Sequence, residues 1–149
     1  MKKKIRSISA RTTEEFAASC AREILKKRSR ARLGALIVGL VGDPGAGKTT
    51  FVRGFLRGLG VRGRVVSPTF LILRRYSNVY HIDAYRIHRA SELLPLGFKE
   101  IIKNPKNIVV IEWADKIRRA LPPSTLWIRF SHGVHDKDRI IIHENTSSH

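Results

Sequence analysis

The chain has 149 residues, of which 42% are hydrophobic, enough for one domain with an ordinary core and too many for a disordered chain. No apolar run approaches the roughly 20 residues that cross a bilayer, and no apolar core follows the basic start after Met1, so we expect neither a membrane span nor an export signal. Lys and Arg number 29 against 12 Asp and Glu, a formal net charge of +17 that attracts polyanions.

The first third of the chain predicts a helix, a buried strand and a second helix, in that order. Thr12 and Glu15 form a capping-box pattern ahead of an apolar stripe at helical spacing. The near-continuous apolar run over residues 36–41 is typical of a strand buried on both faces. From there, apolar side chains over residues 52–59 recur on one face of a helix that Gly60 can close.

The rest of the chain predicts strands with one irregular helix among them. Residues 70–76 and 79–82 are spaced as a hairpin with its turn at Ser77-Asn78. A short irregular helix that Ser91 can cap follows. The other expected strands are residues 65–66, 108–111, 126–130 and 139–143. Strands that alternate with helices indicate an α/β fold, and the hairpin adds antiparallel members to its sheet.

Residues 42–49 match the Walker A pattern at every fixed position. Glycines let successive backbone N–H groups turn inward as an anion nest, and the following helix adds the positive end of its dipole. Lys48 supplies a charge for the β- and γ-phosphates, and the Thr49 hydroxyl can ligate magnesium. We therefore expect ATP and Mg²⁺ as cofactors. The expected nucleotide-binding residues of the loop are Gly42, Asp43, Pro44, Gly45, Ala46, Gly47, Lys48, Thr49 and Thr50.

Two acidic residues stand at strand ends, where a magnesium–nucleotide site needs them. Glu112 ends the buried strand over 108–111, and Asp83 ends the strand over 79–82. Ligands of an open α/β sheet bind beyond the carboxyl ends of its strands, so both carboxylates are expected to point toward the phosphates. The alternative for each is a surface carboxylate that caps a turn.

Four other residues carry weaker signals. Thr69 lies on a loop from which its hydroxyl can sense the γ-phosphate, although alone it is interpreted as a turn residue. Trp113 follows Glu112 and either lies against the nucleotide or packs. Arg86 can stabilise transferred phosphate charge, but one arginine among so many is a weak signal. His81 is interpreted as an ordinary strand residue.

The phosphate loop and the order of elements together predict an α/β fold, a P-loop NTPase-like three-layer sandwich with a mixed parallel/antiparallel sheet. We expect a single P-loop ATPase domain over residues 1–149, with residues 1–9 and 145–149 frayed. The lone cysteine, Cys20, excludes an internal disulfide and favours a reducing compartment, so we expect a cytoplasmic protein.

The basic excess is uneven along the chain. Residues 1–40 hold 11 basic and 3 acidic side chains, whereas residues 121–149 hold 3 of each. One interpretation is a surface for nucleic acid, the commonest cytoplasmic polyanion. The other is a solvated basic surface, because part of the excess follows a predicted helix end, where the helix dipole favours cations. That cluster consists of Lys26, Lys27, Arg28, Arg30 and Arg32.

Taken together, four blocks resemble the TsaE family, also called YjeE, which are small bacterial ATPases. The blocks are Gly-Asp-Pro-Gly-Ala-Gly-Lys-Thr-Thr at 42–50, Ser-Pro-Thr-Phe at 67–70, His-Ile-Asp-Ala-Tyr-Arg at 81–86 and Ile-Glu-Trp at 111–113. Their order and spacing fit the family over residues 10–143, and the combination is far more specific than the phosphate loop alone.

The resemblance implies a function in making threonylcarbamoyladenosine, the modified base beside the anticodon of ANN-reading tRNAs. Members of the family do not transfer the threonylcarbamoyl group. They bind a partner complex, TsaD with TsaB, and hydrolyse ATP to keep it turning over. A tRNA partner is also expected, through the basic surface.

The resemblance also assigns roles by matching positions. Lys48 binds phosphates, Thr49 and Glu112 hold magnesium, and Asp83 is needed for hydrolysis. Asp83, Lys48 and a switch-like Thr69 form the expected catalytic set. The other expected nucleotide contacts are Trp113, Thr12 and Arg139.

The sequence departs from the family pattern in several places. Pro44 replaces the usual leucine and removes one N–H from the loop, and Ala84 replaces a usual large apolar residue. Residues 71–73 replace a more polar continuation. The basicity is the largest departure, and it bears on contacts with partners rather than on the ATP site.

Two other functions compete with the ATPase. A small-molecule P-loop kinase shares the loop, but it needs an acceptor pocket and usually a basic lid, for which 149 residues leave little room. A basic RNA-binding module with a degenerate ATP site would use the +17 charge, but the intact Lys48, Thr49, Asp83 and Glu112 argue against it.

Overall fold

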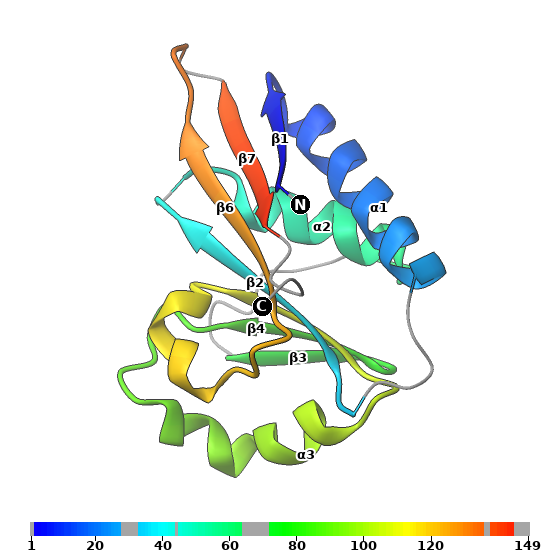
Figure 1. The fold of residues 1–149 in the computed structure, drawn as a ribbon, viewed down its shortest axis with the longest axis vertical. Helices are drawn as coiled ribbons and strands as arrows, with labels where there is room; N and C mark the ends of the chain where they lie inside the picture. Colours follow the sequence, from blue (N-terminus) through cyan, green and yellow to red (C-terminus); the bar gives the residue numbers. More distant parts are fainter. Residues whose placement is uncertain (1, 28–32, 44, 64–71, 136–137, 145–149) are drawn as a thin grey trace.

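The computed structural model describes residues 2–27, 33–43, 45–63, 72–135 and 138–144. Within them, seven strands form one sheet with helices on both faces (Figure 1). The strands are β1 (Lys2–Ser7), β2 (Leu36–Gly42), β3 (Leu73–Tyr76), β4 (Val79–Asp83), β5 (Ile108–Glu112), β6 (Leu126–His132) and β7 (Arg139–Glu144). The α-helices are α1 (Ala10–Lys27), α2 (Lys48–Gly58) and α3 (Phe98–Lys103), and two 3₁₀ segments are η1 (Ala90–Leu96) and η2 (Ala114–Ala120).

The middle of the sheet is parallel and its two margins are antiparallel. The strand order is β1-β7-β6-β2-β5-β4-β3, with parallel pairing from β6 through β2 and β5 to β4. The register pairs Leu40 of β2 with Glu112 of β5, and Glu112 with Asp83 of β4. The carboxyl ends of these three strands therefore meet at one edge of the sheet, next to the phosphate loop that follows β2.

Two apolar cores lie on opposite faces of the sheet. Helices α1 and α2 cover one face, where the Phe51 ring lies 5.4 Å from that of Phe130 and 5.8 Å from that of Phe55, measured between centroids. The other face is covered by η1, α3 and η2, with Leu93 and Ile117 buried against it. This arrangement confirms the expected three-layer α/β sandwich with a mixed sheet.

Close packing of α1 against α2 fixes the helix that follows the phosphate loop. A Cβ atom at Gly54 would lie 2.2 Å from the carbonyl oxygen of Glu14, and one at Gly58 would lie 2.6 Å from that of Ala18. Only hydrogen fits at both positions, so the two helix backbones touch directly. Because α2 carries Lys48 at its first position, this contact helps to hold the lysine in place.

The expectation that residues 1–9 fray is wrong for Lys2–Ser7. These residues form β1, which pairs antiparallel with β7 along its whole length. The hydroxyl of Ser7, a fully buried residue, also lies 2.6 Å from that of Thr13 on α1. Backbone pairing with a distant segment thus orders a stretch whose own side chains are mostly basic.

The two expected helix caps are also wrong, because other residues supply them. Helix α1 begins at Ala10, and the Ser9 hydroxyl accepts a 3.1 Å hydrogen bond from the Thr12 N–H, so Thr12 lies inside the first turn. The η1 segment begins before Ser91, and Glu92 accepts the backbone N–H groups just ahead of it.

Most of the other expected elements are confirmed. The hairpin joins β3 to β4 with its turn at Ser77-Asn78, where Ser77 has a φ of 58°. The irregular helix is broken at Gly97 into η1 and α3. The expected strand over 65–66 and the expected frayed tail over 145–149 lie outside the described residues. In the described part of the chain, no helix is long and apolar enough to span a membrane.

Candidate functional site

The phosphate loop connects β2 to α2, and its backbone explains its glycines. Gly42, Gly45 and Gly47 have φ values of 139°, 73° and 102°, a region that side chains disfavour. At Gly42 a Cβ atom would also lie 2.2 Å from the carbonyl oxygen of Phe130 on β6. The loop can therefore turn sharply out of the sheet and begin α2 at Lys48. Pro44 lies outside the described residues.

Lys48 is 95% buried and folds back over the loop that precedes it. Its Nζ donates hydrogen bonds to the carbonyl oxygens of Gly42, at 2.5 Å, and Asp43, at 2.8 Å. The same Nζ lies 4.2 Å from the ring centroid of Trp113. Burial lowers the pKa of Lys48 below its ordinary value, although the negative charge of Glu112 acts in the opposite direction.

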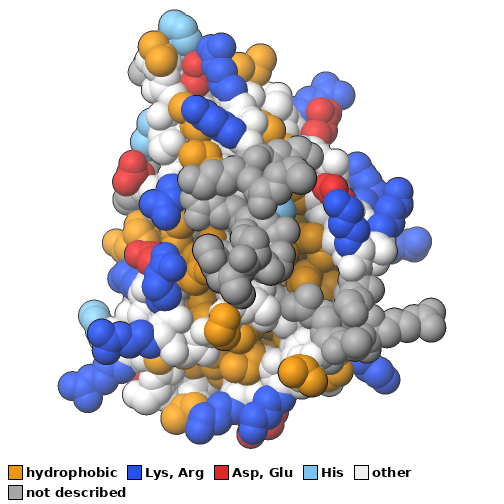
Figure 2. Space-filling view, viewed as in Figure 1, with side chains coloured by type: hydrophobic (Ala, Val, Ile, Leu, Met, Phe, Trp, Pro, Cys, Tyr) orange, Lys and Arg blue, Asp and Glu red, His pale blue; other side chains and the backbone are white. Residues whose placement is uncertain are grey.

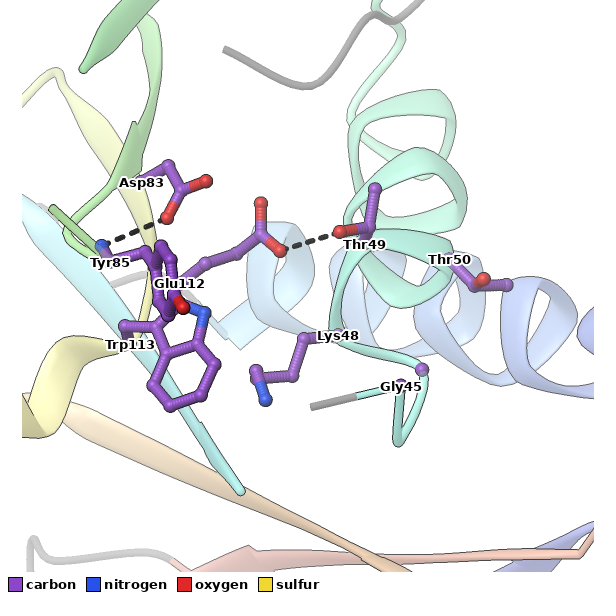
Figure 3. A pocket seen from close by; sticks show the side chains of 9 residues that line it. Gly45, Lys48, Thr49, Thr50, Asp83, Tyr85, Glu112 and Trp113 are labelled. Atoms are coloured by element: carbon purple, nitrogen blue, oxygen red, sulfur yellow. Dashed lines mark hydrogen bonds between the residues drawn. The ribbon is translucent and has the colours of Figure 1, made fainter. Parts of the chain in front are cut away.

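Glu112 connects the end of β5 to α2. Its Oε1 accepts a hydrogen bond from the Thr49 hydroxyl at 2.7 Å, as Figure 3 shows. Its Oε2 lies 2.7 Å from Nε2 of His81, a fully buried side chain on β4. Burial acts to raise the pKa of Glu112, but the hydrogen bond and charge of His81, together with Thr49 and Lys48, outweigh it and hold that pKa below its ordinary value.

Asp83, at the end of β4, is the second carboxylate of the site. Its Oδ1 accepts a 3.0 Å hydrogen bond from the backbone N–H of Tyr85, so the Asp83 side chain turns beside Tyr85 (Figure 3). Burial raises the pKa of Asp83 above its ordinary value, and the negative charge of Glu112 adds to the rise. The surroundings thus stabilise the ionised form of Glu112 and destabilise that of Asp83.

A cavity of 390 Å³ joins these groups on one side of the phosphate loop. Its lining residues are Gly45, Gly47, Lys48, Thr49, Thr50, Asp83, Tyr85, Glu112 and Trp113. The aromatic wall is built by Tyr85 and Trp113, whose ring centroids are 5.1 Å apart. Trp113 has a φ of 58°, which is rare for a bulky residue, and this turn directs the indole toward Lys48.

A second cavity, also of 390 Å³, lies on the other side of the loop. Its lining residues are Ser9, Ala10, Thr13, Gly45, Gly47, Thr50 and Arg139. Arg139, the first residue of β7, donates a 3.2 Å hydrogen bond from Nε to the carbonyl oxygen of Gly45. The two cavities share Gly45, Gly47 and Thr50, so they adjoin each other at the part of the loop next to α2.

The structure brings together most of the site residues that the sequence predicts. Thr12 does not line either cavity, because its hydroxyl lies 3.0 Å from that of Ser9, and the neighbouring Thr13 lines the second cavity instead. Thr69 lies outside the described residues. The contact of His81 with Glu112 and the position of Tyr85 in the cavity wall were not predicted from the sequence.

The donor atoms at Thr49 and Glu112 fit a magnesium ion. A hydroxyl and a carboxylate oxygen 2.7 Å apart lie beside the phosphate loop, and Mg²⁺ prefers oxygen ligands of this kind. The described residues hold no group of three or more His, Cys, Asp or Glu side chains arranged as a metal site. A site with so few protein ligands suits an ion that keeps several waters and shares the phosphates of a nucleotide.

Comparison with known proteins identifies relatives in the TsaE family. The profile of the family described as Threonylcarbamoyl adenosine biosynthesis protein TsaE matches residues 7–141. The tRNA threonylcarbamoyladenosine biosynthesis protein TsaE of Haemophilus influenzae is 37% identical over 102 residues, which are 66% of this chain and 64% of the relative. The protein of the same name in Bacillus subtilis is 42% identical over 96 residues, 62% of this chain and 59% of the relative. Each match therefore spans less than two thirds of the relative's length.

A further relative and a solved structure extend the likeness. TsaE of Streptomyces coelicolor is 34% identical over 122 residues, which cover 77% of this chain and 81% of the relative. The crystal structure of YdiB from Bacillus subtilis superposes with a TM-score of 0.76 at 28% identity, over 99% of this chain and 87% of that one. Because the family profile matches nearly the whole length, the chain belongs to the TsaE family.

Proposed function

We propose that this protein is a magnesium-dependent ATPase that serves the biosynthesis of threonylcarbamoyladenosine in tRNA. The names of its family and relatives support the pathway. The observation that carries the ATPase is the hydrogen bond between Thr49 and Glu112, 2.7 Å long, beside a buried lysine and a glycine loop. This function belongs to the cytoplasm, where tRNA is modified.

ATP would lie along the phosphate loop with its two ends in the two cavities. The triphosphate and its metal belong on the Glu112 side, where Lys48 and Thr49 lie. The nucleoside belongs on the other side, near Thr13 and Arg139. Lys48 donates hydrogen bonds to two loop carbonyls, so it must exchange these contacts for phosphate oxygens when ATP binds.

Different residues of the first cavity would have different roles in hydrolysis. Thr49 and Glu112 would hold Mg²⁺, which neutralises charge on the β- and γ-phosphate oxygens when bound. Asp83 would accept a hydrogen bond from the attacking water, because its carboxylate is only half-buried and faces the cavity. Trp113, which lines the same cavity, would lie beside the nucleotide. The switch-like role expected of Thr69 rests on the family resemblance alone, because Thr69 lies outside the described residues.

The partner of this ATPase would be a protein complex of the TsaD–TsaB type. The decisive experiment measures release of phosphate from ATP by the protein alone, with that complex, and with the complex and tRNA. We expect release with water as the only acceptor, and a higher rate when the complex is added. Transfer of labelled phosphate to a nucleoside, sugar or other metabolite would favour the kinase instead.

We also propose that tRNA contacts the basic cluster at the end of α1. Figure 2 shows Lys and Arg side chains spread over the face in view rather than gathered in one patch, so charge alone does not mark a binding site on that face. Lys26 and Lys27 are exposed at the end of α1, although Lys27 also pairs with Glu23 at 3.0 Å. Arg28, Arg30 and Arg32 lie outside the described residues.

A salt series with a matched control tests this contact. Reversing Lys26 and Lys27 to Glu should flatten the dependence of tRNA affinity on salt, because each phosphate contact releases counterions. Reversing Lys99 and Lys103, exposed on α3 in the opposite layer, should leave that slope closer to the wild-type value. Equal changes in the two variants would mean that tRNA responds only to net charge.

A further inference from the structure

His81 is a buried polar side chain that has no role in the hydrolysis proposed above. Its exposed fraction is 0%, and its only described hydrogen-bond partner is Glu112, with Nε2 and Oε2 2.7 Å apart. Its other ring nitrogen, Nδ1, is buried and has no partner among the described residues. Burying a polar group without satisfying all its hydrogen bonds costs stability, so the burial of His81 calls for a functional explanation.

The position of His81 follows from strand alternation. Successive residues of β4 point to opposite faces of the sheet, so His81 shares a face with Asp83. The register pairs His81 with Val110 and Asp83 with Glu112, which makes Glu112 the diagonal neighbour of His81. This is the face that α1 and α2 cover, since Val79 and Val110 belong to their core. The imidazole therefore lies beneath the carboxylate that faces Thr49.

The two oxygens of Glu112 have different partners. Oε1 accepts from the Thr49 hydroxyl, and Oε2 faces the imidazole of His81. An ionised carboxylate can only accept hydrogen bonds, so Nε2 of His81 is the donor. The contact fixes both the ring and the direction of the carboxylate.

We propose that His81 is a positioning residue, which holds Glu112 so that its Oε1 and the Thr49 hydroxyl form a metal-binding pair before the nucleotide arrives. Without the imidazole, Oε2 would lose its partner in a buried place, and the carboxylate would turn to find another. Partners of this kind, behind a metal ligand, typically contribute about 10- to 100-fold to metal affinity. The inference rests on the proposed role of Glu112 in holding Mg²⁺.

The test compares two substitutions that replace different nitrogens of the ring. The amide nitrogen of His81→Gln can reach the place of Nε2, whereas the shorter His81→Asn can replace only Nδ1. Calorimetry would measure the affinity for ADP and for a non-hydrolysable ATP analogue, with Mg²⁺ and with a chelator. For His81→Asn we expect the gain in affinity due to Mg²⁺ to fall by about 10- to 100-fold. His81→Gln should stay within a few-fold of wild type, and affinity in chelator should change in neither.

Glu112→Gln separates failure of this inference from failure of the proposed function. If Glu112 holds the metal through His81, His81→Asn should cause no further loss in the Glu112→Gln background. A Glu112→Gln variant with wild-type Mg²⁺ dependence would overturn the metal role itself. If instead Glu112→Gln loses that dependence while His81→Asn keeps it, His81 does not position the carboxylate. Equal losses in His81→Asn and His81→Gln, or thermal unfolding that tracks the loss, would also overturn the proposal.

Discussion

The two faces of the sheet bury different kinds of side chain, although the same strands build both. On the face covered by η1, α3 and η2, β4 contributes Tyr80 and Ile82, and β5 contributes Val109 and Ile111. The alternate residues of these strands, on the face of α1 and α2, include the polar groups of the site: His81, Asp83 and Glu112. One face thus serves mainly packing, and the other combines packing with chemistry at its carboxyl edge.

This difference shows how a parallel sheet builds a site at little cost to its core. Because side chains alternate, a polar residue on one face leaves the apolar pattern of the other face intact. The polar groups also sit where the phosphate loop leaves β2, so their partners come from the loop and from α2. Substitutions on the two faces should therefore separate function from stability.

The largest effect is expected from Asp83→Asn. If this carboxylate accepts a hydrogen bond from the attacking water, turnover should fall by about 100- to 10,000-fold. Nucleotide affinity should change little, because the loop, Lys48 and Thr49 stay intact. Phosphate release and calorimetry together would show this. A parallel loss of binding and turnover would mean that Asp83 acts on the nucleotide or the loop rather than on water.

Lys48→Ala should mainly affect binding. The substitution removes the point charge of the phosphate loop, and hydrogen bonds to charged groups contribute about 1.5–3 kcal/mol each, so affinity for ATP should fall by roughly 100-fold. It also frees the carbonyls of Gly42 and Asp43, so thermal unfolding should be measured without nucleotide. Wild-type ATP affinity in a folded Lys48→Ala protein would contradict the proposed site.

The two faces of the sheet offer one core substitution each, Leu93→Ala on the packing face and Phe51→Leu on the face of α1 and α2. Leu93→Ala, in η1, should cost about 2–5 kcal/mol of unfolding free energy, because Leu93 is fully buried. ADP affinity should stay at the wild-type value at temperatures where the variant is folded. Phe51→Leu, in α2, should lower both stability and ADP affinity, since the Phe51 ring packs on Phe130 beneath the loop. Loss of ADP affinity in Leu93→Ala would break the separation between the faces.

The parts of the site that belong to short local patterns could be predicted from the sequence. The Walker A pattern identified Lys48 and Thr49, and the end of a buried strand identified Glu112. The contact of His81 with Glu112 was not visible, because it depends on β4 lying parallel and next to β5 in one register. The signal was available only as spacing, since His81 stands two residues before Asp83 on a predicted strand.

Long-range pairing explains why β1 and the second cavity were not predicted. Residues 2–7 are mostly basic and lack a strand pattern of their own, yet they pair with β7, more than 130 residues away. The second cavity likewise combines residues near Ser9, the loop and Arg139, which no local motif connects. Such contacts depend on topology, and a single sequence specifies topology only through all its elements together.

The smallest expected effect is a change in stability with pH. It tests whether the polar groups on the face of α1 and α2 destabilise the folded protein. Because burial raises the pKa of Asp83 above its ordinary value of 3.8, the folded protein favours the neutral carboxylic acid and disfavours the ionised carboxylate. The folded state therefore loses stability as pH rises through that raised pKa. Asp83→Asn removes this loss and should melt slightly above wild type at neutral pH.

The difference in melting temperature between Asp83→Asn and wild type should then shrink as pH falls through the raised pKa toward 3.8, where the wild-type carboxyl is neutral as well. Solvent reaches the half-buried Asp83 side chain, so the effect is small. Nucleotide-free thermal unfolding across this pH range would measure it. If Asp83→Asn melts below wild type at neutral pH, the hydrogen bond that the carboxylate accepts from the Tyr85 N–H stabilises the folded protein by more than burial of the charge destabilises it. The ionised Asp83 would then stabilise the folded state.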